Sequence, residues 1–185
     1  MRGGGRAIGG VLLAASIAGA AAAQTPAARS ATISGTNVLG VAPGATLQDT
    51  AQALQGCDQH MLEHATPGRS GLTLHARCGD LSVDYVLNPD SHTVQRAEIR
   101  DGALSTAGGV RVGDDIATAV AHYGTPSVEA SAGDVCAVFA SQRGVSFCLR
   151  PEDARAYLER VGSKERPPLR GKIGSILVFG TAGQK

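Results

Sequence analysis

The clearest hydrophobic pattern in the chain lies between Gly109 and Pro126. Apolar residues recur there at intervals of three and four, which is the spacing of one face of an α-helix. They are Ile116, Ala119, Val120 and Tyr123. Asp114 is a candidate N-terminal cap before this stripe, and Gly124 followed by Pro126 is typical of a helix end. The segment therefore predicts a short helix with both ends marked.

A weaker copy of the same pattern occurs upstream, from Gly40 to Leu54. Thr46 is expected to begin a helix there, and Asp49 three residues later suits a loose capping box. Because the two stretches align residue by residue, we expect an internal duplication. A second short helix is predicted from Asp58 to His64.

Strict alternation of apolar and polar residues predicts two antiparallel strands, Leu72–Cys78 and Leu81–Asn88, and a third strand follows at Val94–Arg100. One face of this sheet should pack against the helix, and the other should face solvent. The charged residues expected on the solvent face are His75, Arg77, Asp84, Arg96 and Glu98. We interpret them as a candidate binding row for a partner.

The second half of the chain repeats the order of helix and strands. Strands are expected at Val135–Ala140 and Val145–Arg150, with a turn at 141–144. An extra helix is predicted at Pro151–Val161, because Pro151 suits the first helical position and acidic residues follow it. After a basic loop, Ser163–Lys172, the apolar stretch Ile173–Phe179 predicts a well-covered closing strand.

These elements predict an α+β fold of two tandem helix-plus-antiparallel-sheet units. The units would span residues 35–104 and 105–185, with the inserted helix at 151–161 in the second. Residues 24–34 are small and polar and are expected to form a disordered lead-in.

The first 23 residues have the features of a secretory signal peptide. Arg2 and Arg6 are followed by an apolar run and by three alanines that end at Ala23, the expected cleavage site. The run is shorter than a membrane span needs, and no cysteine precedes Cys57 to accept a lipid. We therefore expect a periplasmic or secreted protein with neither a membrane span nor a lipid anchor.

Composition narrows the classes of partner. The chain carries 17 basic and 16 acidic residues, so its charge gives no reason to expect a polyanionic partner. It has no Trp and only three Tyr and three Phe, which disfavours stacking platforms for nucleic acid. No nucleic-acid partner is expected, and the oligomeric state is left open.

Four cysteines in an exported chain favour two disulfides over a metal site. Three pairings are possible. The favoured one joins Cys57 with Cys78 and Cys136 with Cys148, because the second pair flanks the predicted hairpin at matching distances from its turn. Each unit would then contain one bridge.

The repeated start Gly-Val-x-x-Gly, the amphipathic helix and the following meander resemble the small exported proteins grouped around the β-lactamase inhibitor protein. The same pattern is similar to outer-membrane assembly lipoproteins that carry one helix-plus-sheet unit. This resemblance implies that the sheets of the two units form a continuous surface, and that the role is to bind or inhibit another protein rather than to catalyse a reaction.

One short motif in the sequence is typical of a catalytic site. His60, Glu63 and His64 fit the H-x-x-E-H pattern, in which two histidines on one helix face bind zinc and the glutamate activates water. A third protein ligand would have to come from elsewhere, and the expected helix is only about two turns long. A small zinc hydrolase is therefore kept as the third hypothesis, and no metal or cofactor is predicted.

The first hypothesis is a non-catalytic protein-binding module of the bacterial cell envelope that uses the exposed sheet face. The second is a stoichiometric inhibitor of a secreted or periplasmic hydrolase. In both, the partner is another envelope or secreted protein.

Overall fold

Eight strands form one continuous antiparallel sheet in the computed structural model, which describes residues 31–66, 69–161 and 167–180. The strand order is β2-β3-β4-β5-β10-β9-β8-β7. The strands are β2 (Asp58–Thr66), β3 (Arg69–Cys78), β4 (Leu81–Leu87), β5 (Val94–Ile99), β7 (Ser127–Ser131), β8 (Asp134–Val138), β9 (Val145–Leu149) and β10 (Ile173–Phe179). The predicted signal peptide, residues 1–23, lies outside the described residues.

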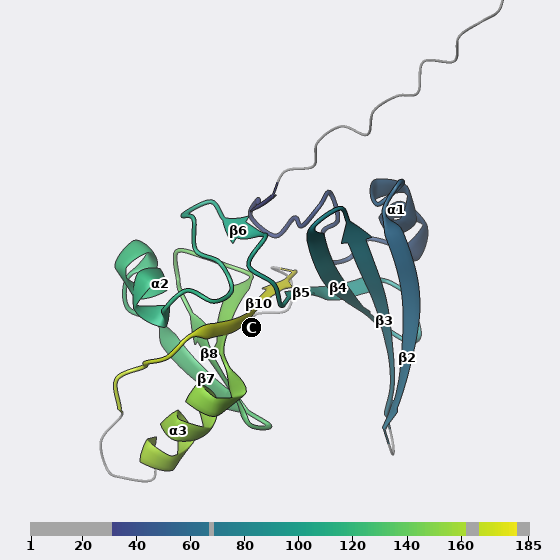
Figure 1. Ribbon diagram of the computed structural model, residues 1–185. Coiled ribbons are helices and arrows are strands. Elements are labelled where there is room, and N and C mark those ends of the chain that lie inside the picture. The colour runs from purple at the N-terminus through teal and green to yellow at the C-terminus, as the bar shows by residue number, and fades with distance from the viewer. Residues whose placement is uncertain (1–30, 67–68, 162–166, 181–185) are drawn as a thin grey trace, which may run out of the picture.

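Three helices and a small parallel pair of strands complete the fold. The helices are α1 (Leu47–Ala53), α2 (Ile116–Tyr123) and α3 (Pro151–Val161), and the pair consists of β1 (Thr32–Ile33) and β6 (Ser105–Thr106). Figure 1 shows β2 and β7 at opposite ends of the sheet, with α1 beside the β2 end and α2 and α3 beside the β7 end. The helices predicted at 116–123 and 151–161 and the strand at Ile173–Phe179 are confirmed.

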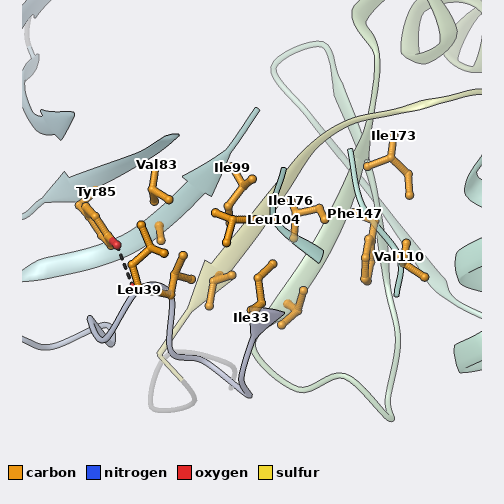
Figure 2. Close-up of a cluster of buried hydrophobic side chains, with 14 of the residues drawn as sticks. Ile33, Leu39, Val83, Tyr85, Ile99, Leu104, Val110, Phe147, Ile173 and Ile176 are labelled. Atoms are coloured by element: carbon orange, nitrogen blue, oxygen red, sulfur yellow. Dashed lines mark hydrogen bonds between the residues drawn. The ribbon is translucent and has the colours of Figure 1, made fainter. Parts of the chain in front are cut away.

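A single hydrophobic core joins the two halves of the chain. Strand residues such as Tyr85, Ile99 and Phe147 are almost completely buried in one cluster (Figure 2). Ile116 of α2 and Tyr157 of α3 belong to the same cluster. The Tyr85 hydroxyl donates a hydrogen bond of 2.8 Å to the carbonyl of Val38 and so ties the N-terminal loop to the sheet. The buried apolar residues of α2 and α3 belong to this cluster, and Leu47 and Ala53 of α1 pack against it.

The predicted organisation of the α+β fold into two tandem helix-plus-sheet units is wrong. β5 and β10 are hydrogen-bonded neighbours, with Ile176 opposite Ile99 and Val178 opposite Ala97, so the strands of both halves belong to one sheet. Pairing β5 with β10 removes two exposed strand edges at once and buries apolar residues from both halves together. Local periodicity cannot reveal this, because the pairing joins strands far apart in the chain.

The helix predicted from Asp58 to His64 is also wrong, because this segment forms the edge strand β2. All nine of its residues pair with β3, from Asp58 opposite Arg77 to Thr66 opposite Arg69. The Cys57–Cys78 bridge lies one position beyond the first of these pairs. Cross-strand pairing and the bridge together override the weak helical pattern of a short segment.

Smaller corrections concern three segments. Residues of the expected disordered lead-in form β1, where Ile33 is 2% exposed. β7 was not predicted, because its sequence alternates weakly and all five of its residues are exposed. The cap of α2 is Asp115, which accepts a hydrogen bond from the amide of Ala117, whereas Asp114 accepts one from the amide of Arg111 in the preceding loop.

Both predicted disulfides are confirmed. Cys57 is bonded to Cys78, and Cys136 to Cys148. Cys136 and Cys148 lie directly opposite each other on β8 and β9, as the symmetric spacing about the turn predicts. Cys57 and Cys78 pack against the core cluster, so the two bridges lie on opposite faces of the sheet.

Candidate functional site

The face of the sheet opposite the core carries the candidate site. Because side chains alternate along a strand, the neighbours of the buried residues point to this other side, which we call the open face. Its half-buried or exposed members include His75, Arg77, Ser82, Asp84, Val86, Arg96, Glu98, Leu177 and Phe179. Cys148 is the one buried apolar residue among the described residues that stands outside the core cluster.

Strand register places polar residues from four strands in one row across the open face. His60 lies opposite His75, His75 opposite Asp84, and Asp84 opposite Glu98. Residues directly opposite each other in antiparallel strands have side chains close enough to interact. The row therefore gathers ionisable groups that are far apart in the sequence.

Hydrogen bonds and ion pairs connect this row. His75 Nδ1 lies 2.7 Å from Asp84 Oδ1. Arg100 Nη2 lies 2.6 Å from Glu98 Oε1, and Arg100 Nε lies 3.8 Å from Asp84 Oδ2. Glu98 is the most covered member, with 14% of its side chain exposed, and Arg100 the least, with 67%. We call His75, Asp84, Glu98 and Arg100 the charged row.

The charged row contributes little to holding the fold together. Ion pairs that remain in contact with solvent typically contribute about 0 to 1 kcal/mol each, because water screens them and ordering the side chains costs entropy. His75 and Asp84 are 34% and 27% exposed, which leaves both groups in contact with solvent. The row therefore keeps charges of both signs at the surface without being required for the core.

The other two predicted site residues occupy different positions. Arg77 is exposed and donates from Nε to the carbonyl of Gly79 in the turn that follows β3, so it stands apart from the charged row. Arg96 lies on β5 opposite Val86 and Phe179 and lines a cleft on the other half of the open face. Contacts therefore link His75, Asp84 and Glu98 through Arg100, whereas Arg77 and Arg96 lie on the same face without an ion pair to these residues.

The cleft has a volume of about 260 Å³ and lies over β5, β10, β9, β8 and β7. Its lining combines one basic, two acidic, two hydroxyl and several apolar side chains. The lining residues are Arg96, Glu129, Ser131, Ala132, Asp134, Cys136, Ser146, Leu177 and Phe179.

The helical zinc pattern does not form. His60 and Glu63 lie on the strand β2, and along a strand residues three positions apart point to opposite faces. Residues 60 and 64 of an extended strand are separated by about 13 Å, too far for the two to share one ion as they would on a helix. The described residues contain no group of three or more His, Cys, Asp or Glu that could hold a metal ion.

Two sets of residues at the candidate site were not predicted from the sequence. Arg100 could have been found, because Arg96, Glu98 and Arg100 alternate along the predicted third strand and must share a face. Glu129 and Asp134 could not, because they join the cleft through β7 and its turn into β8, and β7 was not recognised as a strand.

No family model and no curated protein matches this chain. Among solved structures, the crystal structure of the uncharacterized protein YfeY from Escherichia coli matches with a TM-score of 0.46 and 16% sequence identity, covering 78% of this chain and 96% of that one. A match at this level assigns neither family nor function.

Two structural findings bear on location. Disulfides form and persist in oxidising compartments, so the two bridges fit an exported protein. None of the helices in the described residues is long and apolar enough to cross a membrane.

Proposed function

We propose that this chain is an exported, non-catalytic protein-binding module of the bacterial cell envelope, and that it binds its partner through the open face of the sheet. The observation that carries the proposal is the charged row. It places charges of both signs side by side on a face to which none of the described helices contributes its buried side chains.

The chemistry of the row suits recognition of another protein. Complementary charges at an interface steer association and select the correct partner more than they add affinity. Arg100 forms ion pairs with the carboxylates of Asp84 and Glu98. When a partner binds, these groups can form ion pairs with the partner instead. The open arrangement along the strands also offers a broad surface rather than a single pocket.

The proposal is tested by comparing two variants of the chain that lacks residues 1–23. One carries His75→Ala, Asp84→Ala and Glu98→Ala on the open face, and the matched control carries three exposed changes on α3, Glu152→Ala, Arg155→Ala and Glu159→Ala. Each is immobilised and incubated with envelope extract, and the proteins retained by the unchanged chain are identified. Binding of the principal retained protein is then measured with purified components.

We expect the open-face variant to lose at least about tenfold in affinity for that protein, which corresponds to about 1.4 kcal/mol, while the α3 variant binds like the unchanged chain. Added salt should slow association, since the contact is charged. Equal binding by the open-face variant, or loss only in the α3 variant, would show that the partner uses another surface.

A further inference from the structure

Arg96 lines the cleft, and its guanidinium makes no hydrogen bond or ion pair with the described residues. Arg96 Nε is inaccessible to solvent and makes no hydrogen bond, and it is the one buried side-chain nitrogen or oxygen atom in this condition among the described residues. A buried donor that is left unsatisfied costs free energy, and a charged one costs more than a neutral one. Because Nε is closed to solvent, a ligand in the cleft can reach only the terminal Nη atoms of this guanidinium.

Two carboxylates line the same cleft as Arg96. Glu129 and Asp134 are both exposed, and neither forms an ion pair within the part of the chain that the structure describes. A simple anion bound to Arg96 would be repelled by these two negative charges. A ligand with a negative group for Arg96 and a positive group for the carboxylates would satisfy both sides of the cleft.

The rest of the lining is largely apolar. Leu177 and Phe179 are half-buried beside Arg96, and Cys136 contributes its disulfide with Cys148. The hydroxyl-bearing Ser131 and Ser146 also line the cleft. Its volume of about 260 Å³ lies just below the range of pockets that enclose drug-sized ligands, which suits a smaller molecule.

We infer that the cleft binds a zwitterionic ligand of amino-acid size with an apolar side chain. The carboxylate of the ligand pairs with Arg96, its ammonium group lies toward Glu129 and Asp134, and its side chain contacts Leu177 and Phe179. Arg suits the first role because its planar guanidinium can donate two parallel hydrogen bonds to a carboxylate. This site adjoins the charged row, since Leu177 lies opposite Glu98, but it shares no residue with it, so the inference does not rest on the proposed function.

The test is a calorimetric titration of the chain that lacks residues 1–23 with L-leucine and L-methionine. N-acetyl-L-leucine, which lacks the ammonium group, and L-leucinamide, which lacks the carboxylate, are titrated beside them. We expect at least one of the two amino acids to bind, and each blocked form of leucine to bind at least about tenfold more weakly than leucine, because each loses one charge-assisted contact.

Three variants assign the contacts. Arg96→Leu should abolish amino-acid binding and, without ligand, unfold at a temperature no lower than the unchanged chain, because it removes the unsatisfied donor. Glu129→Gln changes an exposed residue, and it should weaken binding of leucine but not of N-acetyl-L-leucine. Arg155→Leu, the matched control on the exposed side of α3, should bind like the unchanged chain.

Any of four results would overturn the inference. These are no binding of either amino acid in the millimolar range, equal binding of leucine and N-acetyl-L-leucine, unchanged binding by Arg96→Leu, and a clear loss of stability in Arg96→Leu. The last result would mean that Arg96 supports the sheet rather than a ligand. None of them affects the test of the charged row, which uses different residues and a protein partner.

Discussion

Removal of the Cys57–Cys78 bridge offers the sharpest test of how this sheet is stabilised. The bridge closes a loop of 21 residues in the unfolded chain, which in the loop-entropy treatment gives about 3.3 kcal/mol of stabilisation at 25 °C. The Cys136–Cys148 bridge closes 12 residues and gives about 2.8 kcal/mol by the same treatment. Domains of this kind are typically stable by about 5 to 15 kcal/mol, so either loss is large.

Removal of each bridge should destabilise a different part of the sheet. Cys57 precedes the edge strand β2, which has only one neighbouring strand, β3. Cys136 lies on β8 and Cys148 on β9, and each of these two strands has a neighbouring strand on both sides. We therefore expect Cys57→Ala with Cys78→Ala to increase amide hydrogen exchange selectively in β2, because edge strands open without unfolding the rest of the sheet.

The assay is urea unfolding of the two double-alanine variants at equilibrium, with the unchanged chain in reductant as a control. Each variant should lose about 3 kcal/mol without a change in the denaturant slope, and reductant should bring the unchanged chain to a state less stable than either variant. A loss below about 1 kcal/mol for the Cys57 and Cys78 variant would refute the loop-closure reasoning. Mass spectrometry of the unreduced protein supplies a separate check, since a Cys57–Cys136 cross-link would contradict the pairing.

Two further substitutions test single contacts by urea unfolding. Tyr85→Phe should cost about 0.5 to 1.5 kcal/mol, because it removes one hydrogen bond in the core while the Val38 carbonyl keeps the one from the Val41 amide; Tyr157→Phe is the matched control, and an equal loss there would assign the effect to ring packing. Asp115→Ala should cost about 1 kcal/mol by removing the cap of α2, and Asp115→Asn should cost much less because asparagine also caps. Equal losses for Ala and Asn would mean that the charge of Asp115, rather than its hydrogen bond, matters.

Elements with strong local signals could be predicted from the sequence. The stripe of Ile116, Ala119, Val120 and Tyr123 gives α2, and the alternation around Val83 and Tyr85 gives β4 with its faces correctly assigned. The same alternation placed His75, Asp84 and Glu98 on one face. In these segments, local periodicity and burial in the folded chain agree.

The failures share a physical cause, which is that long-range pairing decides the structure. Residues 58–64 carry apolar residues at positions compatible with either a helix or a strand, and only pairing with β3 selects the strand. β7 has no buried residue, so nothing in its sequence distinguishes it from a loop. The join between β5 and β10, and with it the cleft beside Arg96, depends on residues that are distant along the chain.

The position of β10 imposes an order on assembly. β10 is the last strand along the described chain, yet it fills the centre of the sheet between β5 and β9. Until residues 173–179 are available, the two groups of strands on either side have no hydrogen-bonded connection, and each presents a bare central edge. Contacts of such high sequence separation slow folding. A chain synthesised from its N-terminus therefore cannot complete this sheet before residues 173–179 have emerged.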